Sequence, residues 1–220
     1  MKSRSKWLSL IVALVILSIP FFYALSVYDK LPETIATHFD IEGKPNGFGP
    51  KSSIYLGPII LGIAGLLVFL LLQNITRIDP KKTKGIDPAL FGKIGYLMVV
   101  FMSVLGLIIV YSSVQPGNFF LKYLFSLMGL LFAALGYIFP SIKPNYFVGF
   151  RVPWTLENED NWTATHKMAG KWWMYGGILQ VILGILLSPA HAMISFFIIM
   201  AVMVAVPTGF SYQYFKKHSA

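Results

Sequence analysis

The sequence predicts an all-α membrane protein, built as a bundle of six transmembrane helices. Three observations carry this prediction: an apolar composition, six long apolar runs and an uneven distribution of basic residues. Hydrophobic residues make up 56% of the 220 positions and charged residues only 12%, about half of the charged fraction of soluble domains. Since a spanning helix needs about 20 apolar residues, six spans leave room for loops but not for a large soluble domain.

The six apolar runs follow one another along the chain, and each should be a helix because lipid offers the backbone no hydrogen-bond partner. They cover residues 7–27, 53–72, 94–114, 119–139, 172–187 and 192–214. The first run is longer than the apolar core of a secretory signal, so we interpret it as a retained helix that is kinked at Pro20. Prolines close the third, fourth and fifth runs, at Pro116, Pro140 and Pro189.

Basic residues set the predicted orientation of the bundle. Fourteen of the 18 basic residues fall in four segments: the N-terminus, the loops 74–93 and 140–171, and the C-terminus. Basic loops favour the cytoplasm. We therefore expect both termini to be cytoplasmic and a small hairpin-like loop, residues 29–52, to be extracellular between the first two helices. The same rule explains the net charge of +9, so we expect no direct binding to nucleic acid.

The predicted bundle interior carries no Asp, Glu or Arg. Ionisable residues inside a bilayer usually mark ion paths or proton relays, so their absence disfavours a proton-coupled carrier, an ion pump and an intramembrane aspartyl protease. Gln180 is the deepest strongly polar side chain, and it either contacts a substrate or forms an interhelical hydrogen bond. Small residues spaced by four, such as Gly129 and Ala133, serve helix packing, a substrate path or a dimer face.

Motifs that would indicate an enzyme are missing from the sequence. It contains no cysteine, which excludes disulfides, thiolate metal sites and a cysteine nucleophile. It also contains no Gly-rich phosphate loop, no His-Glu-x-x-His and no Gly-x-Ser-x-Gly. We therefore expect no enzyme activity, no metal and no cofactor.

The predicted outer loop contains a strand and a turn. Apolar residues alternate with other residues from Ile35 to Ile41, which indicates a short strand, and Pro45-Asn46-Gly47 predicts the turn of a hairpin. Side chains two apart in a strand point the same way, so His38 and Asp40 should form a pair. This pair either contacts a metal or ligand or stiffens the loop. The candidate ligand-binding residues of this loop are His38, Phe39 and Asp40.

The predicted inner loop, residues 140–171, contains a helix start and two tryptophans, and Trp172 and Trp173 directly follow it. Thr155 or Asn158 can cap a helix that runs toward the fifth span. A single face of that helix carries Trp162, Thr165, His166 and Ala169. The tryptophans favour the headgroup zone of the membrane. Arg151 and His166 bind a lipid phosphate or a partner, or Arg151 pairs with one of three nearby acids. The candidate binding residues of this loop are Arg151, Trp154, Trp162 and His166.

These two loops resemble the motifs of a known family. The inner-loop residues Asn145, Gly149–Asn158, Trp162, Thr165-His166 and Gly170 resemble the signature of the SdpI/YfhL family of bacterial membrane immunity proteins. The outer-loop residues Leu31-Pro32, Ile35, His38-Phe39, Gly43 and Lys51 resemble a short domain of unknown function that often precedes that signature. The resemblance suggests a two-helix unit over residues 1–73 and an SdpI-like four-helix unit over residues 74–220.

The family resemblance also implies a function. SdpI-type proteins are multi-span proteins of the bacterial cytoplasmic membrane, and the founding member gives immunity to a secreted hydrophobic toxin peptide. That member also holds a small transcriptional repressor at the membrane when the peptide is present. The implied partners are membrane lipids, the peptide outside and the repressor inside. Two alternatives are a small permease or exporter of an amphiphile and an interfacial enzyme that uses His166 as its general base.

Overall fold

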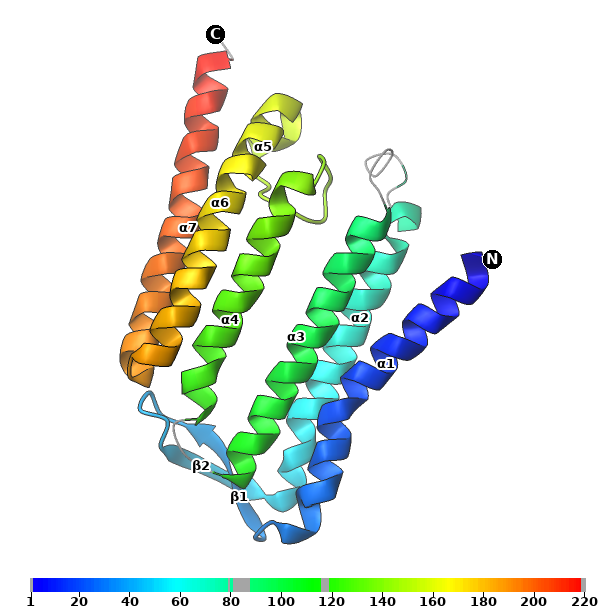
Figure 1. Cartoon of the computed structure of the whole chain (residues 1–220), viewed down its shortest axis with the longest axis vertical. Coiled ribbons are helices and arrows are strands. Elements are labelled where there is room, and N and C mark those ends of the chain that lie inside the picture. The colour runs from blue at the N-terminus through cyan, green and yellow to red at the C-terminus, as the bar shows by residue number, and fades with distance from the viewer. Residues whose placement is uncertain (1, 79, 81–87, 116–118, 219–220) are drawn as a thin grey trace. The chain divides into compact units, whose positions relative to one another are not determined.

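The computed structural model describes residues 2–78, 80, 88–115 and 119–218 of the chain (Figure 1). These residues form two compact units that interleave along the sequence. The first unit contains residues 1–73, 91–124 and 188–190, and the second contains residues 74–90, 125–187 and 191–220. Each unit has a buried hydrophobic core of its own.

Five helices among the described residues are long and apolar enough to cross a membrane, which agrees with a helical, multi-span protein. They lie in the segments Lys6–Lys30, Lys51–Ile78, Pro88–Val114, Tyr123–Ser141 and Pro189–His218. The predicted count of six is not confirmed, because α6 (Glu159–Leu186) is not among the five. This helix begins before the predicted start at Trp172, and its first turns are polar. The predicted end of the third run, at Pro116, lies outside the described residues.

Helices α1 (Lys2–Val27), α2 (Leu56–Ile78) and α3 (Pro88–Val114) supply most of the first unit. Their buried apolar side chains include Ala13, Leu17, Phe69 and Val99. The hydroxyl of Tyr96 donates to the backbone carbonyl of Ser9 at 2.9 Å. Ser103 donates to the carbonyl of Ile16 at 2.7 Å. These contacts attach α3 to α1. The division predicted from the sequence, into residues 1–73 and 74–220, instead placed α3 with the later helices, and that division stays a prediction.

An antiparallel β-hairpin follows α1, which confirms a hairpin between the first two helices. Its strands are β1 (Thr34–Phe39) and β2 (Pro45–Pro50). The pairing is irregular between Ala36 and His38 and again between His38 and Phe39. Bulges of this kind interrupt the strict alternation of side chains that the sequence predicts.

The position of the hairpin turn differs from the prediction. The segment Pro45-Asn46-Gly47 begins β2 and does not form the turn. The chain reverses just before it, where the Asp40 carboxylate accepts the backbone amides of Glu42 and Lys44, both at 2.9 Å. Gly43 has a φ of 83° there, a conformation that glycine adopts without strain. Asp40 and Gly43 therefore supply the turn chemistry that the sequence pattern assigned to later residues.

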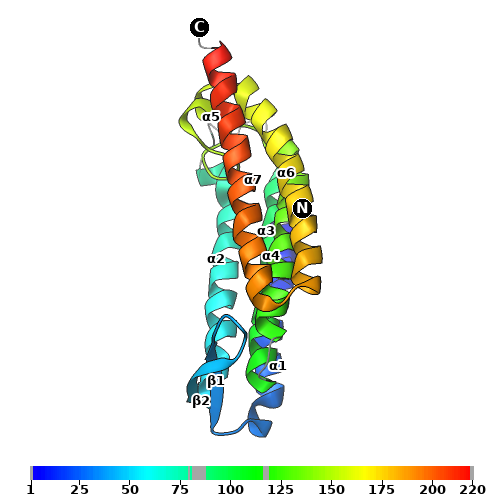
Figure 2. The ribbon, with the colours of Figure 1, turned by 90° about the vertical axis from the view of Figure 1, so that its left-hand side faces the viewer.

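The second unit consists of α4 from Phe125 onward, α5 (Pro153–Glu157), α6 and α7, and α4 itself covers Phe119–Ile138. Helix α7 (Pro189–His218) lies next to α6 in both views of the ribbon (Figures 1 and 2). The Gln180 amide on α6 donates to the carbonyl of Ala192 on α7 at 3.1 Å. It also accepts the hydroxyl of Ser195 at 3.1 Å. The interhelical interpretation of Gln180 is therefore confirmed.

Glycines bring the backbones of α4 and α6 into direct contact. A Cβ atom on Gly129 would lie 2.7 Å from the carbonyl oxygen of Gly177, and one on Gly136 would lie 2.7 Å from that of Gly170. Since real Cβ atoms are never this close to a neighbouring carbonyl, only glycine fits at these crossings. The small residues noted in the sequence thus serve helix packing within this unit.

Candidate functional site

The residues of the inner-loop signature form one buried polar network in the second unit. His166 lies on α6, and only 1% of its surface is exposed. Its Nε2 accepts the backbone amide proton of Phe150 at 2.9 Å. Because an amide can only donate, Nε2 carries no proton, and the proton resides on Nδ1. Nδ1 donates to the carbonyl of Trp162 at 2.9 Å.

The environment of His166 keeps the imidazole uncharged. Burial lowers the pKa of His166 from 6.5 to about 4, and the hydrogen bond to the Trp162 carbonyl opposes this shift. The direction fits an imidazole whose Nε2 must accept a proton from the backbone. Both ring nitrogens are engaged, so this geometry gives no support to His166 as a general base.

Trp162 stacks on the imidazole and fixes the beginning of the loop. Its indole is 0% exposed, and the ring centroids of Trp162 and His166 are 4.1 Å apart. The indole nitrogen donates to the backbone carbonyl of Ile142 at 2.7 Å. Trp162 therefore packs inside the protein and does not face solvent or lipid, while its depth relative to the membrane stays a prediction. The predicted common face is confirmed, since Trp162, Thr165, His166 and Ala169 are all buried.

A tight turn between η3 (Phe139–Ser141) and α5 brings the Phe150 amide to the imidazole. The buried Asn145 side chain accepts the amides of Phe147 and Val148, both at 2.8 Å. Gly149 has a φ of 122°. A Cβ on Gly149 would collide with Nε2 of His166 and lie 3.1 Å from the Trp162 ring. This position therefore requires glycine for its backbone angle and for the close approach of the ring.

Two predicted capping residues hold the short helix α5 and the start of α6. The hydroxyl of buried Thr155 accepts the backbone amide of Val152 at 3.1 Å. The Asn158 side chain accepts the backbone amide of Asn161 at 2.8 Å, which confirms Asn158 as the cap of α6. These caps satisfy donors that a helix start would otherwise leave unpaired.

The same loop is attached to α7 through Ser211. The indole nitrogen of Trp154 donates to the Ser211 hydroxyl at 2.8 Å, and its ring meets that of Tyr212 edge-on with centroids 5.3 Å apart. Asn161, which is fully buried, donates to the Ser211 carbonyl at 3.0 Å. Trp154 thus joins α5 to α7, a contact that the sequence pattern did not indicate.

Arg151 lies outside this network. Its side chain is exposed, and its guanidinium donates to the backbone carbonyl of Tyr146. Within the described part of the chain it forms no ion pair with Glu157, Glu159 or Asp160, one of the alternatives that the sequence left open. Of the four candidate residues in this loop, Arg151 is the one whose side chain is exposed.

The three outer-loop candidates have separate partners. His38 Nδ1 bonds the side-chain oxygen of Asn46, and Asp40 holds the hairpin turn. The expected pair of His38 and Asp40 is therefore not formed, because pairing is irregular on both sides of His38 and β1 ends before Asp40. The ring of Phe39 stacks against that of Phe120, with centroids 6.1 Å apart. No cluster of three metal-binding side chains occurs among the described residues.

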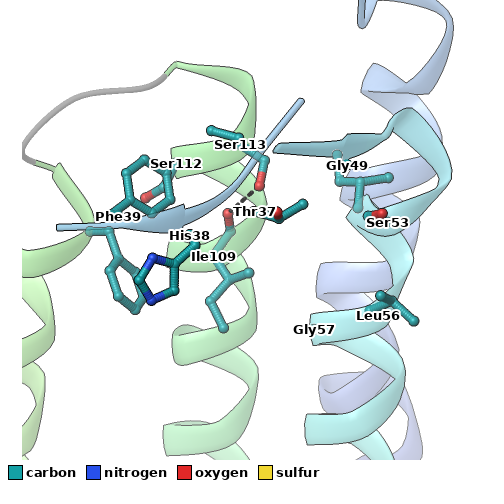
Figure 3. Close-up of a pocket in the computed structure, with 13 residues that line it drawn as sticks. Thr37, His38, Phe39, Gly49, Ser53, Leu56, Gly57, Ile109, Ser112 and Ser113 are labelled. Carbon is teal, nitrogen blue, oxygen red and sulfur yellow. Dashed lines mark hydrogen bonds between the residues drawn. The ribbon is translucent and has the colours of Figure 1, made fainter. Parts of the chain in front are cut away.

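A pocket of about 560 Å³ opens beside His38 and Phe39 in the first unit (Figure 3). The strand β1 forms one wall, and the others come from Gly49 of β2, the short helix η2 (Lys51–Tyr55) and the adjacent ends of α2, α3 and α4. The lining residues that the sequence analysis missed include Ser53, Gly57, Ile109, Ser112, Ser113 and Phe120. The adjacent serines at the end of the third apolar run were the one local signal of a polar feature there.

The helices and the two loop structures define a multi-pass helical membrane protein with a folded signature loop. The model of the SdpI/YfhL protein family matches residues 141–211, and that of the domain of unknown function DUF1648 matches residues 15–62. The resemblance that the two loops predicted is confirmed: the signature region matches the SdpI/YfhL family, and the region ahead of it matches DUF1648. The family match covers the whole network from Ile142 to Ser211.

One relative is similar to most of the chain, and another is similar to about a quarter of it. Immunity protein SdpI of Bacillus subtilis (strain 168) is 21% identical over 209 residues, which cover 94% of this chain and 96% of that protein. An uncharacterized protein of Archaeoglobus fulgidus is 31% identical over 58 residues, 26% of this chain and 32% of that protein. No solved structure matches the chain.

Proposed function

We propose that this chain is an immunity or resistance protein of the bacterial cytoplasmic membrane, which protects the cell against a secreted hydrophobic toxin peptide. The observation that carries the proposal is the similarity to Immunity protein SdpI along 94% of the chain. A match of this extent includes both the hairpin and the signature loop. The proposed role is non-enzymatic, which is consistent with the engagement of both nitrogens of His166.

The proposed arrangement has six spans, with α6 as the fifth, both termini in the cytoplasm and the hairpin outside. The distribution of basic residues supports this orientation. Because the sequence has no cysteine, one introduced cysteine reports on one position. A membrane-impermeant maleimide should label Glu42→Cys in intact cells and Lys217→Cys only after lysis. Labelling of Lys217→Cys in intact cells would contradict the arrangement.

Immunity itself can be tested by complementation. The chain is expressed in a Bacillus subtilis strain that lacks its immunity protein SdpI, and the cells meet the hydrophobic killing peptide. We expect survival above that of the empty-vector strain. A second arm deletes the native gene and scores survival against peptides secreted by related bacteria. Normal membrane levels without a change in survival in either arm would refute the proposal.

We also propose that the loop carrying Arg151 holds a small transcriptional repressor when the peptide is bound. The exposed guanidinium supports this role, since it can make two-pronged hydrogen bonds to a carboxylate. The alternative of an amphiphile permease lacks comparable support. The Gln180 side chain is hydrogen-bonded between α6 and α7. Gly129 and Gly177 lie in the direct backbone contact of α4 with α6. These residues therefore serve helix packing and do not line a substrate path.

A further inference from the structure

The pocket beside β1 has a chemical character that identifies its ligand. None of its 13 lining residues is Asp, Glu, Lys or Arg. Apolar side chains form its walls: Phe39, Ile54, Leu56, Ile109 and Phe120. Hydroxyl groups are interspersed among them, from Thr37, Ser53, Ser112 and Ser113. An uncharged apolar site with a few hydrogen-bonding groups is typical of a ligand that is itself neutral and largely apolar.

We propose that this pocket binds an extended, uncharged apolar segment of a peptide that reaches the protein from outside the cell. That the ligand is a secreted peptide, and that it arrives from outside the cell, rests on the proposed immunity function. The assignment of the pocket rests on its own geometry. At about 560 Å³, it lies within the usual 300–1,000 Å³ of ligand pockets and exceeds the volume of one side chain.

The strand β1 favours a peptide as the occupant. Four consecutive residues of the strand, Ala36 to Phe39, line the pocket. The sheet has two strands in the described part of the chain, so one edge of β1 has no partner strand there. An extended peptide can add to such an edge through main-chain hydrogen bonds, while pockets beside the edge receive its alternate side chains.

The polar groups of the pocket have the hydrogen-bonding capacity that a peptide backbone needs. Ser112 and Ser113 donate to the carbonyls of their own helix, at 2.7 Å to Ile108 and 3.2 Å to Ile109. Their oxygens retain lone pairs that can accept a peptide N–H. His38 points into the pocket in Figure 3 with Nδ1 already bonded to Asn46, which leaves Nε2 for a ligand.

The absence of charge disfavours a phospholipid as the occupant. A lipid phosphate would be expected to meet an arginine or lysine, and the described residues of the lining include neither. Lys51, which directly follows β2, forms an ion pair with Glu33 at 2.9 Å. The aromatic stack of Phe39 on Phe120, 6.1 Å between centroids, instead offers a flat apolar wall for a Leu, Val or aromatic side chain.

Cysteine protection tests the pocket directly, in the full-length protein in membrane vesicles. Ser113→Cys lies in the pocket, and Ser26→Cys is its matched control. Both serines donate to a carbonyl of their own helix, and Ser26 is exposed outside the pocket. The probe is the purified hydrophobic killing peptide of the complementation assay. Saturating peptide should slow maleimide labelling about tenfold at Ser113→Cys, by mass action, and leave Ser26→Cys unchanged.

Three results would overturn the assignment. Labelling rates that do not change at Ser113→Cys would show that the peptide does not occupy the pocket. Equal slowing at both cysteines would show that the peptide only coats the membrane. Slow labelling of Ser113→Cys without peptide, relieved by detergent, would show a lipid in its place.

The outcome is separable from that of the complementation assay. Survival without protection of Ser113→Cys would keep the immunity function and reject the pocket. Protection of Ser113→Cys without survival would keep the pocket and reject the immunity function. An independent check fills the pocket with Ser113→Phe and follows labelling at a second lining position, Ser53→Cys. Ser113→Phe should abolish both the protection of Ser53→Cys by the peptide and the survival of the cells. Ser26→Phe, outside the pocket, should abolish neither. Unchanged protection in Ser113→Phe at normal membrane levels would also reject the pocket.

Discussion

His166 accepts the backbone amide proton of Phe150 at 2.9 Å, across sixteen positions of sequence. The bond joins the buried face of α6 to the middle of the signature loop. It also determines the protonation of the imidazole, because a second proton on Nε2 would point at the amide hydrogen of Phe150. The histidine of the signature therefore holds the loop in place as a neutral acceptor.

This geometry predicts that stability falls in mild acid. The folded pKa of His166 is about 4 against 6.5 in the unfolded chain, so between these values the unfolded state binds more protons. Stability is therefore highest above pH 6.5 and declines as the pH falls toward 4, by up to about 3 kcal/mol. The measurement is thermal unfolding of the detergent-solubilised protein across this range. His166→Leu should be less stable at pH 7 and should lose this part of the pH dependence; an unchanged slope in that variant would contradict the assignment.

Gly149→Ala should destabilise the loop. The substitution places a Cβ against the imidazole and on a residue with a φ of 122°, and strained backbone of this kind costs on the order of 1–3 kcal/mol before the collision is added. Gly92→Ala on α3 is the control, since its Cβ would meet nothing within 4 Å and alanine favours a helix by about 1 kcal/mol. Equal melting temperatures for the two variants would show that Gly149 is not held in this conformation.

Local sequence patterns predicted the helices, the hairpin and the buried face of α6. Periodicity places Trp162 and His166 four apart on one face, and the structure buries both. Their partners could not be read from a pattern, because they are backbone groups of distant segments. The carbonyl of Ile142 and the amide of Phe150 have no side-chain signature. Without these partners in view, Trp162 and His166 looked like candidates for ligand binding.

The outer pocket was beyond sequence reasoning for a different reason. Its walls come from both strands of the hairpin and from separate helices, and only their packing brings Phe39 and Phe120 together. The pairing of His38 with Asp40 failed because strand alternation assumes regular pairing, whereas the ladder is irregular beside His38. The positions of the side chains at this site therefore depend on the irregular strand pairing, which the alternation of residues in the sequence does not predict.

The contact of α4 with α6 predicts a second glycine effect. A Cβ on Gly177 would lie 2.5 Å from the carbonyl oxygen of Gly129, so Gly177→Ala should push the helices apart and lower protein abundance in the membrane. The matched control is Gly209→Ala on α7, where nothing lies within 4 Å of the added Cβ. Quantitative immunoblots of membrane fractions make the comparison. Full abundance of Gly177→Ala would show that the crossing tolerates a methyl group.

Arg151 and Trp154 should separate recognition from folding. Trp154 is half-buried, donates to Ser211 at 2.8 Å and packs against Tyr212, so Trp154→Ala should detach α5 from α7 and cost about 3–5 kcal/mol. Arg151 is exposed, and its guanidinium donates to a backbone carbonyl outside the buried network. Arg151→Lys should therefore insert normally.

The two variants differ most in the expected readout. Arg151→Lys should weaken protection or repressor capture at unchanged abundance, because lysine cannot make the two-pronged bonds of a guanidinium. Trp154→Ala should reduce abundance and protection together. Membrane immunoblots, survival with the peptide and co-purification of the repressor distinguish these effects. If Arg151→Lys instead lowers abundance alone, the arginine is structural, and if both variants match the wild type, a different surface of the protein meets the partner.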